Sequence, residues 1–363
     1  MIHVFEARLR GLRRWLSRSE WSLRFLRLTK LPDAGSERGL VLIQIDGLSK
    51  TQLERALKRG RMPFLRKLLR REGYHLHSVY SGLPSTTAAA QGELFYGVPC
   101  CIPAFGYRER KERRYMKLLI PECALRMEKA LEKMGRGLCE GGSSYSNIYS
   151  GGAKESHWCA SEFNATAMLR GANPAGFFAV ALWNLGSALK LVGLLVVELL
   201  LALYDSVRGA IMLGEVRQEL LFVFSRVIAC VGLRELITVM ASMDVARGLP
   251  IVHVNFVGYD EQSHRRGPSS AFAHFSLRGI DNCIRRIWMA ANRSSRRDYD
   301  VWIYSDHGQE RTAHYPKEQK RSLEEAVADV LGEEVTGRGG KVRPSAIRSE
   351  NYVGHRLEEL LLH

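Results

Sequence analysis

The stretch VWIYSDHGQERTAH, Val301 to His314, places an apolar run directly before an acid, an imidazole and a glycine. Its first four residues, Val301–Tyr304, favour β-structure and predict a buried strand of a parallel sheet, apolar on both faces. Asp306 and His307 follow the strand, and Gly308 allows a tight turn behind them. Ligands bind beyond the carboxyl ends of strands in open α/β sheets, so the pair indicates a metal site. An Asp-His turn without chemistry is the alternative.

Two further predicted strands end in the same way. The run Gly39–Ile45 is followed by Asp46 and a glycine, and the run Ile251–Val257 leads to Asp260, with His264 four residues later. One helical turn places Asp260 and His264 on the same side of a helix. A mixture of carboxylate and imidazole ligands suits Zn²⁺, with Mn²⁺ as the second choice.

A hydroxyl-bearing loop lies between the first two strand ends. Residues 74–80 are expected to form another strand, which leads into Pro84-Ser85-Thr86-Thr87 at the start of a helix. Unpaired N–H groups at a helix N-terminus stabilise an alkoxide or a phosphoryl group. The alternative is a Ser or Thr that only caps the helix.

The order of these motifs resembles the alkaline phosphatase superfamily, most closely its type I phosphodiesterase/nucleotide pyrophosphatase branch. The family pattern is a strand ending in Asp-Gly, a Pro-x-x-Thr nucleophile loop, an Asp-x-x-x-His and a Ser-Asp-His-Gly. The matching residues are Asp46-Gly47, Pro84 to Thr87, Asp260 to His264, and Ser305 to Gly308. The resemblance covers residues 39–110 and 248–316. It implies an α/β fold in which helices flank a central, mostly parallel sheet.

The resemblance also implies roles for these residues. Thr87 would be the nucleophile, Asp46, Asp306 and His307 would hold one zinc ion, and Asp260 and His264 would hold a second. The family completes the second site with a distal His, for which His314 and His355 are the candidates. We prefer His314, because its short tether to His307 keeps it near the strand end. The Asn that the family often places after the nucleophile helix has no counterpart in residues 99–105.

The cysteine pattern and the net charge limit which structural sites and which binding partners the chain can have. The seven cysteines form no C-x-x-C pair, so neither a disulfide framework nor a structural zinc site is indicated. The net charge of +15 calls for an anionic partner: nucleic acid, an anionic membrane or a phosphorylated substrate. Nucleic acid is disfavoured, because the chain has no helix-turn-helix, zinc-finger or RNA-binding signature.

Two segments outside the resemblance favour a membrane. Residues 1–31 predict a basic amphipathic helix suited to an anionic membrane surface. Residues 171–247 form an insertion between the two parts of the catalytic α/β domain, 39–170 and 248–363, and carry apolar stretches at 176–204 and 220–243. We expect a membrane-associated helical hairpin there. The alternative for both segments is packing against the protein itself.

Together these features predict a metal-dependent phosphoester hydrolase of the phosphodiesterase/pyrophosphatase type. It would use Thr87 and two divalent ions, most simply Zn²⁺, at the cytoplasmic side of the cell membrane. The competing interpretation is a membrane-associated binding or scaffold protein with a degenerate, non-catalytic phosphodiesterase fold.

Overall fold

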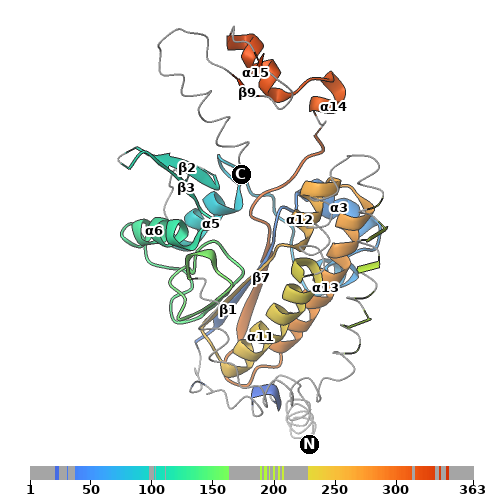
Figure 1. Cartoon of the computed structure of the whole chain (residues 1–363). Coiled ribbons are helices and arrows are strands. Elements are labelled where there is room, and N and C mark those ends of the chain that lie inside the picture. The colour runs from blue at the N-terminus through green and yellow to red at the C-terminus, as the bar shows by residue number, and fades with distance from the viewer. Residues whose placement is uncertain are drawn as a thin grey trace, which may run out of the picture. The chain divides into compact units, whose positions relative to one another are not determined.

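The computed structural model describes residues 21–23, 31, 37–97, 102, 104–110, 112–162, 228–312, 315–331, 335–336 and 341–342, together with isolated positions between 189 and 207. The chain divides into two compact units, residues 1–310 and 311–363 (Figure 1). Within the second unit lie α14 (Tyr315–Gln319), α15 (Leu323–Leu331), and the paired strands β8 (Val335–Thr336) and β9 (Lys341–Val342).

A parallel sheet organises the first unit, as the sequence predicts. Its strand order is β5-β4-β6-β1-β7, and all four neighbouring pairs are parallel. The strands are β1 (Gly39–Ile45), β4 (Ser143–Tyr145), β5 (Glu155–His157), β6 (Ile251–Phe256) and β7 (Tyr299–Tyr304). Because the strands run in the same direction, the carboxyl ends of β1, β6 and β7 meet at one edge of the sheet.

The two faces of this sheet differ in polarity. Residues Val41, Ile43 and Ile45 of β1 belong to the main hydrophobic core. The alternating position Gln44 instead bonds to Gln91 of helix α5 (Thr87–Tyr96). A strand turns successive side chains to opposite faces, so each strand contributes to both an apolar face and a polar one. The prediction of a sheet that is apolar on both faces is therefore wrong.

Strand β7 is an edge strand among the described residues, rather than the buried strand that the sequence predicts. Its Val301 and Ile303 pack against the core, but the side chain of Trp302 is 65% exposed. Apolar character alone does not tell a central strand from an edge strand, because burial depends on what the rest of the chain places beside it.

Helices α11 (Arg234–Arg247) and α13 (Ala271–Ala291) cover the apolar face (Figure 1). From α11, Ile237 and Ala241 enter the same core as β1. This part of the second apolar stretch is thus a core helix, which matches the buried alternative. The stretch 176–204 lies outside the described residues except at isolated positions. Within the described part of the chain, no helix combines the length and the apolar character needed to cross a membrane.

The chain after β1 forms α3 (Lys50–Lys58) and α4 (Pro63–Arg71), broken at Pro63 as predicted. The carboxylate of Asp281 on α13 accepts hydrogen bonds from the N–H groups of Phe64 and Leu65, each at 2.8 Å, and so caps α4. The predicted strand at 74–80 is wrong: this segment has neither helix nor strand, and no strand of the described chain pairs with it.

A smaller layer packs on the polar side of the sheet. It contains α5, the antiparallel hairpin β2 (Gly106–Glu109) and β3 (Arg114–Lys117), and α6 (Pro121–Glu132), around a second hydrophobic cluster. Helix α12 (Gly258–Arg266) follows β6 directly. The site described next lies between α5, α12 and the strand ends.

Candidate metal centre

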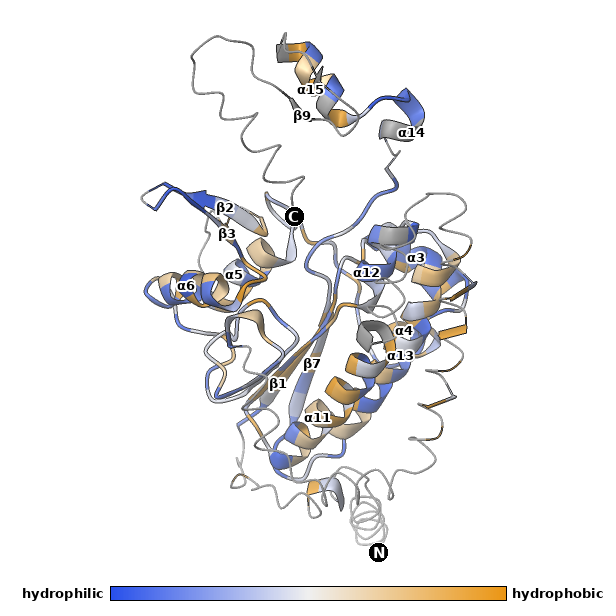
Figure 2. Ribbon diagram, in the orientation of Figure 1, coloured by the Kyte–Doolittle hydropathy of each residue, from blue (hydrophilic) through white to orange (hydrophobic). Residues whose placement is uncertain are grey.

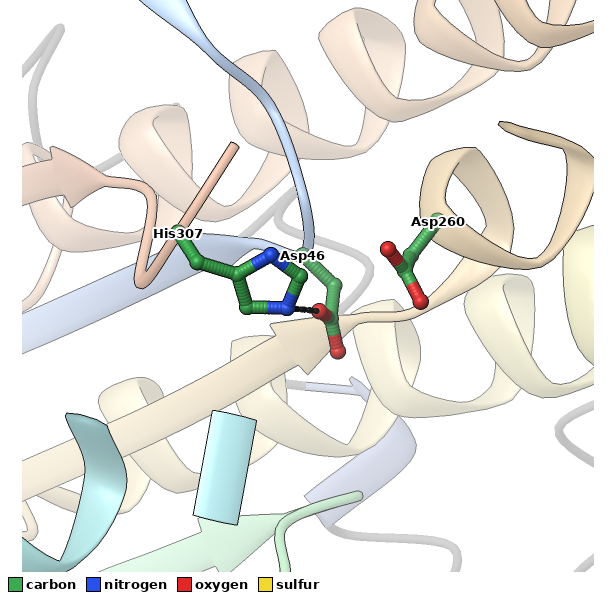
Figure 3. Close-up of side chains that lie close together, drawn as sticks. All are labelled: Asp46, Asp260 and His307. Carbon is green, nitrogen blue, oxygen red and sulfur yellow. Dashed lines mark ion pairs between the residues drawn. The ribbon is translucent and has the colours of Figure 1, made fainter. Parts of the chain in front are cut away.

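The strand ends bring three potential ligands together. Asp46 follows β1, Asp260 lies in the first turn of α12, and His307 follows β7. One ligand atom from each of these side chains lies within 4.8 Å of the others. Figure 3 shows the three side chains converging from separate segments, with an ion pair between His307 and Asp46. Residues far apart in sequence thus form one cluster of two carboxylates and an imidazole.

The hydroxyl of Thr87 lies in this cluster. Its Oγ1 atom is 3.2 Å from Oδ1 of Asp46 and 3.2 Å from Nε2 of His307. Thr87 is the first residue of α5 and is 5% exposed. The preceding Thr86 is the N-cap residue, but its side chain makes no capping bond, and its Oγ1 is buried without a partner. The structure therefore places Thr87, rather than Thr86, against the acid and the imidazole.

Asn255 holds the second oxygen of Asp46. Its Nδ2 atom donates a hydrogen bond to Oδ2 of Asp46 at 3.0 Å. Asn255 lies in β6, next to β1, and is 2% exposed. Because Oδ2 is engaged in this way, Oδ1 of Asp46 is the oxygen that faces Thr87 and His307.

Asp306 is buried beside the cluster. Its Oδ1 atom accepts a hydrogen bond from the N–H of Gly47 at 3.3 Å, and its Oδ2 atom is buried without a hydrogen-bond partner. Burial and the nearby charge of Asp46 raise the pKa of Asp306 to about 7. The ion-pair partner of Asp306 among the described residues is His307, whose Nε2 lies 3.7 Å from Oδ2.

His307 supplies part of the missing positive charge. Burial alone would lower the pKa of its imidazole, but a hydrogen bond to Asp46 and the charges of Asp306 and Asp46 raise that pKa to about 9. The Nδ1 atom lies 3.3 Å from the carbonyl oxygen of Gly308, in reach as a donor. A protonated His307 is therefore the counter-ion that the carboxylates find within the described residues when no metal is bound.

The predicted second pair forms at the side of the cluster. Nε2 of His264 is 3.1 Å from Oδ2 of Asp260, one helical turn apart as predicted. This hydrogen bond raises the pKa of His264, whose side chain is 69% exposed. Gln309 donates a hydrogen bond to Oδ1 of Asp260. The remaining predicted ligand, His314, lies outside the described residues.

The donor set fits a divalent cation. Three carboxylates lie close together, and the only ion-pair partners that the described residues offer to Asp46, Asp260 and Asp306 are the histidines His307 and His264. Two histidines do not balance three carboxylates, and Oδ2 of Asp306 is buried without a hydrogen bond, so a further cation would lower the cost of burial. The residues that converge are Asp46, Asp260 and His307, which the family resemblance divides between two ions.

A pocket of about 630 Å³ opens beside the cluster. Its polar side is formed by Asp46, Thr87, Asn255, Asp260 and His264, and its apolar side includes Phe105, Leu119, Pro121, Ile148, Trp158 and Ala160.

Two residues with an unusual backbone conformation follow β4 and β5. Ser146 and Trp158 line the pocket with positive φ angles of 59° and 56°. Left-handed backbone at residues other than glycine is uncommon and gathers at functional sites.

Sequence reasoning missed the polar residues that surround the cluster. Asn255 and His253 are polar positions two residues apart in an otherwise apolar strand. That alternation was a signal that one face of β6 is polar. The partners of these side chains, such as Asn147, come from a loop whose place beside β6 no local pattern indicates.

Comparison with models of known protein families finds no match to this chain, and comparison with curated proteins finds none either. The functional interpretation therefore rests on the motifs and on the geometry of the site.

Proposed function

We propose that the chain is a metal-dependent hydrolase of phosphoesters, of the phosphodiesterase/pyrophosphatase type, with Thr87 as its nucleophile. The observation that carries the proposal is the hydroxyl of Thr87, at 3.2 Å from both Asp46 and His307 within a cluster of potential metal ligands. A bound divalent cation would polarise a phosphoryl oxygen and favour ionisation of the attacking hydroxyl. Asp46, Asp260 and His307 would hold one ion, with Asp306 beside His307 as a further ligand. The exposed His264, which pairs with Asp260, would offer a ligand atom to a second ion, and Zn²⁺ is the simplest choice for both.

The residues present support a two-step displacement. Asp46 lies where it accepts the proton of Thr87 as Oγ1 attacks phosphorus. The new Oγ–P bond forms as the bond to the leaving oxygen on the opposite side breaks, and the leaving alkoxide takes up a proton from water, while Asp46 keeps the proton of Thr87 until the hydroxyl is restored. Water then attacks the phosphothreonine, which releases phosphate or a phosphomonoester and restores the hydroxyl. The N-terminus of α5 contributes a positive field at the reacting oxygen, because Thr87 occupies its first position.

The surroundings of the pocket support an amphiphilic substrate at an anionic membrane. In the sequence, the hairpin of β2 and β3 is flanked by Phe105 and Leu119, and both of these residues line the pocket. Figure 2 shows the outer end of this hairpin as hydrophilic, and the exposed basic residues of the hairpin are Arg108, Arg110, Arg113, Arg114 and Lys117. Leu119 is 67% exposed beside them. Basic and apolar side chains together suit an anionic lipid surface, which we place at the cytoplasmic side of the cell membrane.

A second candidate function is a membrane-associated scaffold that has kept the fold and lost catalysis. The observation in its favour is that only three ligands converge among the described residues, and one of them, Asp260, already contacts His264 and Gln309. Such a protein would hold the site together through these internal contacts and would need no metal.

Metal content coupled to hydrolysis separates the two candidates. The full chain is purified, its zinc is measured, and an aryl phosphodiester and an aryl phosphomonoester are offered with and without added Zn²⁺. The hydrolase predicts close to two zinc ions per chain and zinc-dependent release of the aryl alcohol. A chain that binds no zinc and cleaves neither ester would favour the scaffold.

The membrane component is tested with vesicles of anionic and of neutral phospholipid. Arg110→Glu combined with Arg113→Glu should weaken binding to the anionic vesicles. The matched control combines Arg70→Glu with Arg71→Glu on α4, where both positions are also exposed. Equal losses in the two double variants would show that total charge, rather than the hairpin, governs binding.

A further inference from the structure

Gln91 occupies an unusual position in the nucleophile helix. It lies four residues after Thr87, so the two side chains share one face of α5. Its side chain is fully buried. The Nε2 atom donates to Oε1 of Gln44 at 3.1 Å and to Oδ1 of Asn147 at 2.9 Å, and the Oε1 atom accepts from the N–H of Ile148 at 2.8 Å. Both N–H groups of the amide and its carbonyl oxygen are therefore engaged.

The partners of Gln91 belong to the two segments that complete the site. Gln44 lies in β1, two residues before Asp46, on the same face of the strand. Asn147 and Ile148 belong to the loop after β4, and both line the pocket. One buried amide thus connects the helix that carries Thr87, the strand that leads to Asp46, and the wall of the pocket.

The loop end of this connection is itself anchored. The Nδ2 atom of Asn147 donates to Oγ of Ser144 at 2.8 Å and lies 2.9 Å from Nδ1 of His253 in β6. His253 lies 2.6 Å from the hydroxyl of Tyr304 in β7, through Nε2. Gln91 therefore binds to a polar network fixed on three strands.

We propose that Gln91 is a positioning residue that fixes the rotation of α5 and so holds Thr87 opposite Asp46. This inference rests on the proposed function, since it concerns how the nucleophile is placed. The apolar side chains of α5, among them Ala88 and Phe95, fill space against the second cluster. Packing of this kind is not directional, whereas three hydrogen bonds fix both the rotation of the helix about its axis and its position along that axis.

Gln91→Met tests the inference, because methionine keeps a similar unbranched shape and removes all three hydrogen bonds. The expected result is a fall in kcat of roughly 100-fold, the scale of an ångström-sized misplacement of a reacting group. Zinc affinity, measured by titration calorimetry, should stay within about threefold of the wild-type value, because metal-site mutations typically cost 10- to 100-fold and Gln91 contacts no proposed ligand.

The matched control is Gln52→Met. Gln52 is also a buried helical glutamine, with bonds to Ser269 and His274, and it lies outside the pocket lining. Both substitutions should lower the melting temperature, but only Gln91→Met should lower kcat. Gln91→Glu is the second variant: it keeps the acceptor for Ile148, and its buried carboxyl group, held neutral by burial, keeps one of the two donors, so its kcat should fall between those of the wild type and Gln91→Met.

The outcomes separate this inference from the proposed function. If the wild-type chain turns over and folded Gln91→Met keeps a kcat like that of Gln52→Met, Gln91 is only structural and the inference is overturned. If Gln91→Met does not fold, a Gln91→Glu variant with wild-type kcat overturns it equally. If the wild-type chain cleaves neither ester, the proposed function fails first, and the positioning role falls with it.

Discussion

Asn255 donates a hydrogen bond to Oδ2 of Asp46 at 3.0 Å and thereby decides which oxygen of that carboxylate faces Thr87. Side chains that orient a metal ligand typically affect metal affinity by 10- to 100-fold. We therefore expect Asn255→Ala to weaken zinc binding by about that factor, measured by calorimetric titration of the full chain. Asn292→Ala is the control, because Asn292 is exposed at the end of α13. Unchanged zinc affinity in Asn255→Ala would show that Asp46 needs no such support.

Thr87→Ala should abolish ester hydrolysis and leave zinc binding largely intact. The hydroxyl of Thr87 faces Asp46 and His307, whereas the hydroxyl of Thr86 has no partner. Thr86→Ala should accordingly retain most of the turnover. Both variants are compared by steady-state kinetics and by trapping of the phosphorylated protein. Loss of activity in Thr86→Ala but not in Thr87→Ala would show that Thr86 is the nucleophile.

Asp306→Asn and His307→Ala should each lose zinc as well as activity. The buried Oδ2 of Asp306 has no hydrogen-bond partner and lies 3.7 Å from Nε2 of His307, which belongs to the converging cluster. Zinc ligands are deprotonated groups: the amide of Asn offers no anionic oxygen, and the methyl group of Ala offers no lone pair. Zinc per chain is measured after dialysis has removed unbound metal. Full retention of zinc in both variants would remove the metal assignment from this strand end.

Gly47→Ala should disturb Asp260. A Cβ atom at Gly47 would lie 2.2 Å from Oδ1 of Asp260, and the φ angle of Gly47 is +68°. The matched control is Gly60→Ala, where φ is +65° and a Cβ atom meets nothing within 4 Å. Both variants should lose about 1–2 kcal/mol of stability from the left-handed backbone. Only Gly47→Ala should also lose zinc affinity, so equal affinity in the two variants would contradict the contact.

His253 should make the fold sensitive to acid. Burial lowers the pKa of its imidazole to about 3, below the ordinary value of 6.5. At a pH between these two pKa values, His253 is protonated in the unfolded chain and neutral in the folded chain. The free energy of unfolding therefore falls by about 1.4 kcal/mol for each pH unit below 6.5. Above pH 6.5 the contribution is fully present.

Urea unfolding at pH 7.0 and pH 5.0 measures this effect. Over the 1.5 units between pH 6.5 and 5.0, the loss from His253 amounts to about 2 kcal/mol. His253→Gln should reduce the fall in unfolding free energy by that amount, and His75→Gln, at an exposed position, serves as the control. An identical fall in the wild type and His253→Gln would show that His253 is protonated in the fold.

The local patterns of the sequence determined much of the architecture. Apolar runs before Asp46, Asp260 and Asp306 located three strand ends, and Pro63 located the break between α3 and α4. The spacing of Asp260 and His264 predicted a contact that the structure contains. These features are local, because strand periodicity, helix spacing and the missing N–H of proline act within a few residues.

Only the tertiary structure decided how the strand ends combine. It brings Asp46, Asp260 and His307 together, leaves His264 at the side, and makes β7 an edge strand with an exposed Trp302. It also reveals Asn255 and Gln91, whose partners lie more than forty residues away in the chain. Strand order and cross-chain hydrogen bonds depend on contacts between distant segments, and such contacts leave no periodic trace in the sequence around each residue.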